Sequence, residues 1–158
     1  IGHFTVDSTN SLPTTPVVNT PLADAEVTSL AAGASANLSV FNSIDANSDS
    51  LSYEFELDTS VAFDSAAKIN SGLIVEGATT TTWQPIGLIE NTHYYWRVRA
   101  LDTGGTSPWQ VSAFFVNVTD DSPGTPQVSN PAPGASVLTT QPSLGVTAGI
   151  DADSELVS

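Results

Sequence analysis

The sequence repeats itself at a fixed separation, and this repeat constrains the fold more than any other feature. The stretch FTVDSTNSLPTTPVVNTPLADAEV, from Phe4, aligns without a gap with FFVNVTDDSPGTPQVSNPAPGASV, from Phe114. Pro16 therefore aligns with Pro126, 110 positions later. Further on, ANLSVFNSIDANSDSLS resembles PSLGVTAGIDADSELVS, which follows in the second copy after four residues fewer. A repeat of this length predicts tandem domains.

The repeat divides the chain into five parts. We expect residues 1–8 to be the last strand of a preceding unit and residues 16–119 to be one complete unit. Residues 125–158 would begin a further unit and stop before its core strands. The Pro-containing stretches 9–15 and 120–124 read as semi-rigid linkers, because proline fixes φ and removes a hydrogen-bond donor. The chain is then expected to be a piece of a longer array.

Alternation of apolar and polar residues with a period of two indicates strands, and no stretch sustains a helical period. The stretches LSYEFEL, from Leu51, and HYYWRVRAL, from His93, show it most clearly. Short strands separated by Gly, Asn, Asp and Pro over about a hundred residues predict an all-β antiparallel sandwich. Residues 59–70 carry the one competing signal, and we expect a short helical turn or an irregular connection there.

Composition limits the partners of such a chain. Its 158 residues carry 17 acidic and 3 basic side chains, a net charge of −14. Nucleic acid and anionic lipid both require basic patches, so neither is expected as a partner. No apolar run approaches the ~20 residues of a membrane-spanning helix. The chain has no Cys, which excludes disulfides and thiolate metal sites. Scarce Lys beside abundant Thr, Ser, Asn and Asp resembles secreted bacterial surface proteins and implies an extracellular or cell-surface location.

The stretch LIENTHYYWRVRALD carries a family resemblance. Its spacing is similar to the tyrosine-corner stretch of fibronectin type III domains, in the residues Leu88, Thr92, Tyr94, Val98 and Ala100. The resemblance implies a Greek-key sandwich of tandem immunoglobulin-like, fibronectin type III-like units. It also implies that Tyr94 packs in the core while its hydroxyl bonds backbone just upstream, and Trp96 lies on the same strand face. The sequence departs from the family at Asn42 and Ala148, where a Trp is usual, and Trp83 or Trp96 is expected to fill that volume.

Arg97 and Arg99 point away from the core in this reading. In the fibronectin type III topology the strand that holds Glu54 and Glu56 pairs with the strand that holds the arginines. We therefore expect a cross-strand ladder of ion pairs, each worth roughly 0.2–1 kcal/mol. An anion-binding site is the alternative, and the outward Tyr95 stays a candidate contact residue on this face.

The stretch DANSDS is a candidate calcium site. Asp45, Asn47 and Asp49 place oxygen atoms at alternate positions, as calcium-binding loops do. The resemblance implies that Asp102, and also Asp7, lie at the same pole of the unit. The pattern recurs as Asp151-x-Asp153-x-Glu155. The alternative is a polar turn, for which Asp, Asn and Ser are the usual residues. No cofactor other than Ca²⁺ is expected.

A structural role is the function that these features favour. We expect a spacer module of a tandem-repeat surface, filament or adhesin-like protein, whose partners are neighbouring repeat units or other copies of the chain. The alternative is an accessory module that binds carbohydrate through exposed aromatics such as Trp109 and Tyr95, or binds a protein through its loops. Catalysis is not expected, because the chain has no Cys, only two histidines and no Gly-x-Ser-x-Gly pattern.

Overall fold

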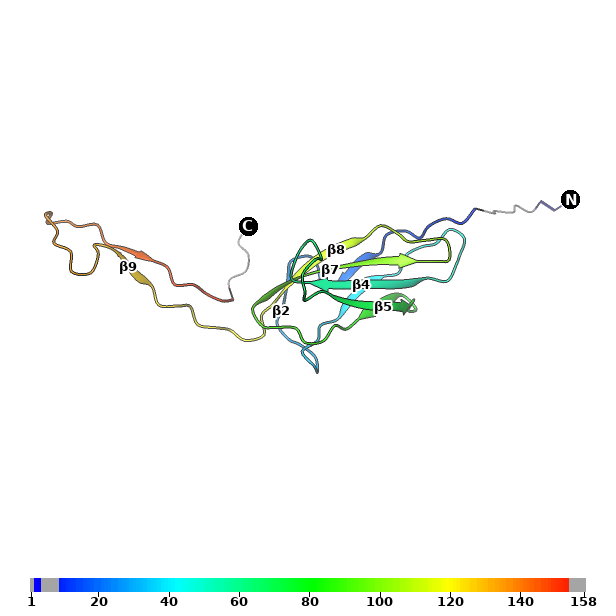
Figure 1. Ribbon diagram of the computed structural model, residues 1–158, viewed down its shortest axis with the longest axis horizontal. Helices are drawn as coiled ribbons and strands as arrows, with labels where there is room; N and C mark the ends of the chain where they lie inside the picture. Colours follow the sequence, from blue (N-terminus) through cyan, green and yellow to red (C-terminus); the bar gives the residue numbers. More distant parts are fainter. Residues whose placement is uncertain (1, 4–8, 154–158) are drawn as a thin grey trace. The chain divides into compact units, whose positions relative to one another are not determined.

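The computed structural model describes residues 2–3 and 9–153 and is all-β, with no helix among these residues. It divides into two compact units, Ile1–Val118 and Thr119–Ser158 (Figure 1). The described residues form the strands β1 (Val17–Thr20), β2 (Ala25–Val27), β3 (Leu38–Phe41), β4 (Ser52–Asp58), β5 (Ile69–Val75), β6 (Thr80–Trp83), β7 (Thr92–Leu101), β8 (Gln110–Val116), β9 (Gln127–Asn130) and β10 (Gly145–Thr147). The strand expected at residues 1–8 lies outside the described residues, apart from residues 2 and 3.

The first unit is built from two sheets. One has the order β1-β3-β6 and the other has the order β2-β8-β7-β4-β5. Neighbouring strands are antiparallel, except that β2 runs parallel to β8. Figure 1 shows β8, β7, β4 and β5 lying side by side. Burial alternates strictly along most of β7, which confirms the strand predicted from its period-two pattern.

A single apolar core lies between the two sheets. Phe55 of β4 stacks on Trp96 of β7, with ring centroids 6.1 Å apart, and meets Trp83 of β6 at the same centroid distance. Trp83 therefore links the smaller sheet to the larger one. Asn42, at the position where the family usually has a Trp, has a polar role instead: its amide donates to the Gly77 carbonyl at 2.7 Å.

Tyr94 occupies the corner that the resemblance predicted. Its side chain is buried, and its ring stacks on Phe114 with centroids 5.6 Å apart. The backbone N–H of Ile89 donates to the Tyr94 hydroxyl oxygen at 3.0 Å. Thr92 donates from its hydroxyl to the Glu90 carbonyl at 3.0 Å. Leu88 is buried in the same core. The predicted hydrogen bond to upstream backbone is thus present.

Replacing Tyr94 with Phe is expected to cost about 1–2 kcal/mol of stability, because the Ile89 N–H then loses its acceptor in a partly buried site. The measurement is urea denaturation of wild type and variant. Tyr95→Phe is the matched control, since Tyr95 is half-exposed on the opposite face of β7 and should change stability by less than about 0.5 kcal/mol. Equal stabilities for Tyr94→Phe and wild type would contradict the corner assignment.

Residues 59–68 form a run of turns organised around one buried carboxylate, and residues 69–70, where the irregular connection was also expected, already belong to β5. Asp58 accepts hydrogen bonds from the backbone N–H groups of Ser60 at 3.2 Å and Ser65 at 3.0 Å, and from the Ser65 hydroxyl. The expected irregular connection is confirmed and no helix forms. Burial opposes the charged form of Asp58, but the hydrogen bonds from Ser65 and Ser60 outweigh it and hold its pKa below the usual range.

This lowered pKa predicts an acid-sensitive connection. A carboxyl whose pKa is lowered on folding stabilises the fold above its unfolded pKa of about 3.9, and that stabilisation is lost as the pH falls through the folded pKa. We expect Asp58→Asn to flatten the dependence of unfolding free energy on pH below about pH 4. Denaturation series between pH 2 and 6 test this, with exposed Asp64→Asn as control. Parallel curves for Asp58→Asn and wild type would refute it.

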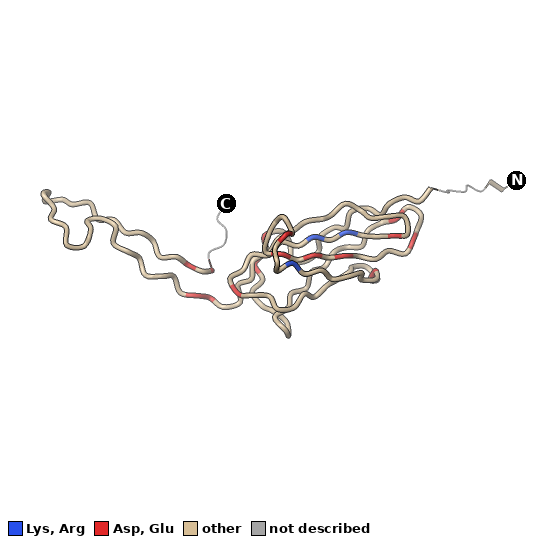
Figure 2. The backbone as a smooth tube through the Cα atoms, viewed as in Figure 1, with Lys and Arg blue, Asp and Glu red and all other residues tan. Residues whose placement is uncertain are grey.

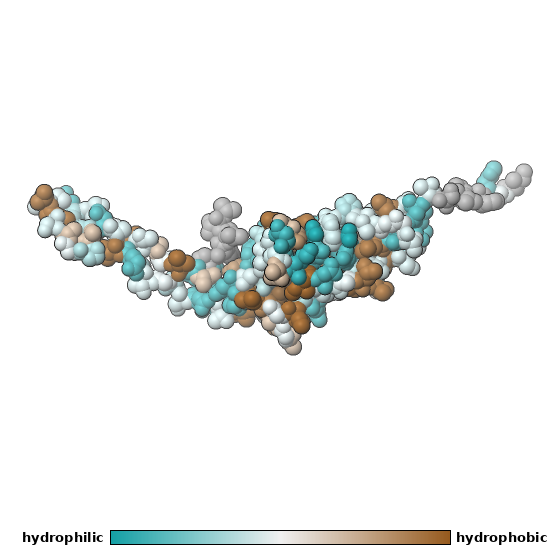
Figure 3. All heavy atoms as spheres, in the orientation of Figure 1, coloured by the Kyte–Doolittle hydropathy of each residue, from teal (hydrophilic) through white to brown (hydrophobic). Residues whose placement is uncertain are grey.

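The second unit repeats the β1–β3 pairing. Val128 of β9 faces Val146 of β10, as Val18 of β1 faces Val40 of β3. The register shift between Val18 and Thr20 recurs between Gly145 and Val146 of the second hairpin. The two hairpins differ in burial, because no described residue of the second unit, up to residue 153, covers its hairpin. Figure 3 shows apolar side chains on the visible surface of this part of the chain.

Candidate functional site

The outer face of the larger sheet carries the predicted ladder. Glu54 lies opposite Arg99 and Glu56 lies opposite Arg97 in the β4–β7 register. The arginine Nη2 atom lies 2.6 Å from a carboxylate oxygen in both pairs. Figure 2 shows these basic positions beside acidic positions of the neighbouring strand. The ladder is confirmed, and the carboxylates occupy the positions that an anion would need.

The remaining basic residue joins the same network. Lys68 Nζ lies 3.7 Å from a Glu56 oxygen, so all three cations of the chain pair with Glu on this face. Partial burial opposes the charge on Glu54, but hydrogen bonds from Asn70 and Arg99 outweigh it and lower its pKa. The three cations and the two glutamates of this face thus form one network of ion pairs within a strongly acidic chain.

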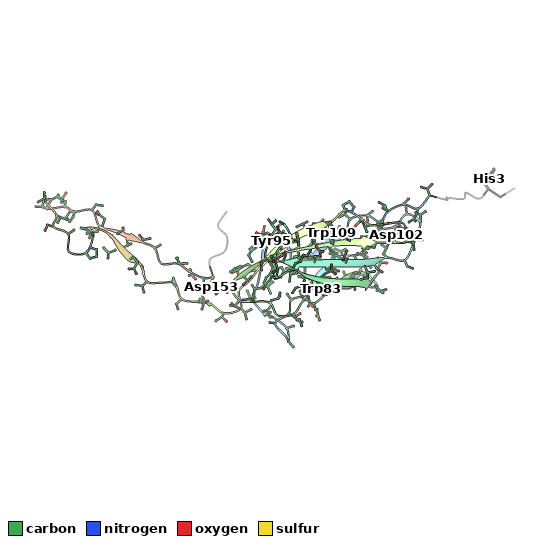
Figure 4. The ribbon with its side chains drawn as sticks, viewed as in Figure 1. His3, Trp83, Tyr95, Asp102, Trp109 and Asp153 are labelled. Atoms are coloured by element: carbon green, nitrogen blue, oxygen red, sulfur yellow. The ribbon has the colours of Figure 1, made fainter. Side chains whose placement is uncertain are left out.

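Aromatic rings cover the two guanidinium groups. The Arg97 guanidinium lies 4.3 Å from the Phe63 ring centroid and 4.4 Å from that of Trp109. The Arg99 guanidinium lies 4.4 Å from the Trp109 ring. Tyr95 contacts His93 instead, with ring centroids 4.9 Å apart. Trp109, labelled in Figure 4, thus contacts both guanidinium groups of the ladder and is itself half-buried.

Two of the predicted calcium ligands, Asp45 and Asp102, accept hydrogen bonds from backbone N–H groups of their own loops. Asp45 Oδ1 accepts from the N–H groups of Asn47 at 2.9 Å and Asp49 at 3.0 Å. Asp102 Oδ1 accepts from the N–H groups of Gly104 and Gly105, both at 2.7 Å. Within residues 2–3 and 9–153, no three His, Asp or Glu side chains converge as metal ligands would.

Calcium binding stays a prediction of the sequence. If Asp45, Asn47 and Asp49 bind Ca²⁺, millimolar Ca²⁺ should raise the melting temperature of the chain. The dissociation constant for Ca²⁺ should be on the order of 10⁻⁴–10⁻³ M. Asp45→Ala and Asp49→Ala should abolish the rise, and Asp24→Ala should leave it unchanged. Calorimetric titration measures the binding directly. A melting temperature that does not respond to Ca²⁺ would leave DANSDS as a polar turn.

Two residues of the linker form hydrogen bonds with the β3–β4 loop and with the β7–β8 loop. The sequence alone did not predict these bonds. Ser11 N–H donates to Asn47 Oδ1 at 2.7 Å, and Asn10 Nδ2 donates to Asp102 Oδ2 at 3.1 Å. The expectation that the two loops share the pole where the linker arrives is confirmed by these bonds. Asp7 lies outside the described residues. The adjacent glycines of the DTGGTSPW loop are the sequence signal that could have indicated this contact.

Comparisons with known proteins show the fold alone. No protein-family model matches the chain, and no curated protein matches it. Twelve chains of solved structures do match. One is an α-L-rhamnosidase from Dictyoglumus thermophilum, with a TM-score of 0.50 and 14% sequence identity. The match covers 78% of this chain and only 16% of that enzyme, so it carries no argument about activity. Among the described residues there is no helix long and apolar enough to cross a membrane.

Proposed function

We propose that this chain is a piece of a tandem array of Greek-key, fibronectin type III-like sandwich domains that acts as an extracellular spacer. The observation that carries the proposal is the second hairpin, which repeats the β1–β3 register one residue pair after another. Leu38 and Val40 are 0% exposed, whereas their counterparts Leu144 and Val146 are 80% and 68% exposed. Such a hairpin requires the remaining strands of a domain to cover it.

The strand order supports the choice of domain type. Immunoglobulin-like sandwiches place their first, second and fifth strands in one sheet and their third, sixth and seventh strands in the other. In this chain β1, β3 and β6 correspond to the first, second and fifth strands, and β4, β7 and β8 correspond to the third, sixth and seventh. The two sheets then follow this division, with β5 as an added edge strand and β2 beside β8. The corner at Tyr94 is a second feature of the same domain type.

A spacer role fits the chemistry of the surface. The arginines, which would be the natural anchors for a ligand, are paired with glutamates and covered by rings. The proposal assigns no catalytic role and expects other repeat units, or other copies of the chain, as partners. Its extracellular location rests on composition, which resembles that of secreted surface proteins.

Carbohydrate binding is the second candidate, because Trp109 and Tyr95 leave part of their rings exposed on one face. A titration of the ¹⁵N-labelled chain with a panel of oligosaccharides separates the two functions. The spacer proposal expects no shift of the Trp109 indole N–H signal at millimolar sugar. A saturable shift of the Trp109 indole signal together with the Arg97 and Arg99 amide signals, with the arginine shifts lost in Trp109→Ala and the Trp83 signals unchanged, would overturn it in favour of a carbohydrate-binding module.

A further inference from the structure

The segment formed by residues 10–14, which we call the leading segment, is bonded to the loop between β3 and β4. Thr14 N–H donates to the Ile44 carbonyl at 3.0 Å, and Ile44 N–H donates to Thr14 Oγ1 at 2.8 Å. Ser11 N–H donates to Asn47 Oδ1 at 2.7 Å. Pro13, between these two contacts, is buried. The segment is therefore held like an element of the domain and unlike a free linker.

The loop between β7 and β8 contacts the same segment. Asn10 donates to Asp102 Oδ2 at 3.1 Å. A Cβ at Gly104 would lie 1.9 Å from Asn10 Nδ2, and a Cβ at Gly105 would lie 2.7 Å from Leu12 Cδ2. At either distance the side chain of Asn10 or Leu12 would have to leave its place. The two adjacent glycines thus make room for the leading segment, which explains their presence in this loop.

The second unit repeats the arrangement in its own residues. Gly124 N–H donates to the Ile150 carbonyl at 2.8 Å, as Thr14 donates to Ile44. Asp121 N–H donates to Asp153 Oδ2, as Ser11 donates to Asn47. The donors are again 110 positions apart in the sequence, and the acceptors lie in the repeated IDANSD and IDADSE stretches. Two copies with different side chains keep the same contacts.

We propose that the pole formed by Asn47, Asp102, Gly104 and Gly105 is a docking surface for the extended segment that precedes the first unit, and that its Asn47 part recurs at Asp153 of the second unit. Its partner is a short proline-containing stretch that offers backbone N–H donors in both copies, and in the first copy also the Asn10 side-chain amide. Docking fixes the direction in which the chain arrives at the unit and makes residues 10–14 part of the domain. Its role in an array rests on the proposed function, whereas the docking itself is a property of this chain.

The test uses ¹⁵N relaxation and amide exchange on the full chain. In the wild type, the heteronuclear NOE of Ser11 and Thr14 should equal that of β3. Gly104→Ala should lower the NOE of residues 10–12, because its Cβ displaces Asn10. Asn47→Ala should speed exchange of the Ser11 amide about tenfold, since one hydrogen bond is lost. Thr103→Ala, an exposed change in the same loop, is the control and should alter neither.

The outcomes are distinct. A wild-type NOE at Ser11 and Thr14 as low as that of a free chain would overturn the docking proposal. So would a folded Gly104→Ala chain with unchanged NOE values. If Gly104→Ala fails to fold, Asn47→Ala decides alone, and an unchanged Ser11 exchange rate would overturn the proposal. None of these results bears on the repeat, which is tested separately through the strands of the second unit.

Discussion

Replacing Trp96 with Ala is expected to lower the free energy of unfolding of the first unit by about 3–5 kcal/mol, enough to unfold a marginal domain. Trp96 is 0% exposed and stacks on Phe55 at the centre of the core. Its indole N–H has no hydrogen-bond partner among the described residues, so the loss would come from packing alone. Equilibrium denaturation in urea, followed by fluorescence of the remaining tryptophans, measures it.

Trp109→Ala is the matched control for this prediction. The same side chain is removed, but Trp109 is half-exposed and lies on the guanidinium groups of Arg97 and Arg99. Cation–π contacts at exposed sites contribute about 0.5–1 kcal/mol each, so the expected loss is about 1–2 kcal/mol. A loss for Trp96→Ala no larger than the loss for Trp109→Ala would contradict the placement of the core.

Leu38 and Leu144 occupy equivalent positions in the two copies of the repeat, and we expect them to contribute very differently to stability. Leu38→Ala should cost about 2–5 kcal/mol, because Leu38 lies buried between the two sheets. Leu144→Ala should change stability by less than about 0.5 kcal/mol, because Leu144 is 80% exposed. Two short strands without a covering layer are at best marginal in water.

Amide exchange extends this comparison to the backbone. We expect β1 and β3 amides to exchange only through global unfolding of the first unit, and β9 and β10 amides to exchange nearly as fast as in an unfolded peptide. Each residue of the second hairpin has its counterpart in the first as an internal control. Equal protection of the two hairpins, or an equal cost for the two Leu→Ala changes, would show that the second unit is complete by itself.

Local patterns predicted the features that depend on local chemistry. The alternation in HYYWRVRAL became β7 because side chains of a strand face opposite sides in turn. The ladder followed from alternation in two strands together with their pairing, which sets Glu54 against Arg99. The corner at Tyr94 followed from a spacing that depends on one hydrogen bond to nearby backbone.

Features that depend on contacts between residues far apart in the sequence could not be predicted from local sequence patterns. The three residues of β2 pair in parallel with β8, and so short a segment has no period to detect. Asn42 bonds the Gly77 carbonyl, 35 positions away, and only the folded chain brings them together. The calcium prediction assumed converging carboxylates, whereas Asp45 and Asp102 accept hydrogen bonds from their own loops. The leading segment read as a linker because its acceptors lie in distant loops.

We propose that residues 119–158 begin a second domain of the same kind as the first. A chimera that joins residues 119–152 to residues 47–118 tests it, because the repeat places Ala152 where Ala46 stands. A second version with Ala148→Asn restores the amide of Asn42.

Calorimetric unfolding is the measurement. We expect one cooperative transition for the chimera, in which Leu144→Ala now costs about 2–5 kcal/mol, as for a buried leucine. Absence of a cooperative transition in both versions, under conditions where residues 9–118 fold, would contradict it.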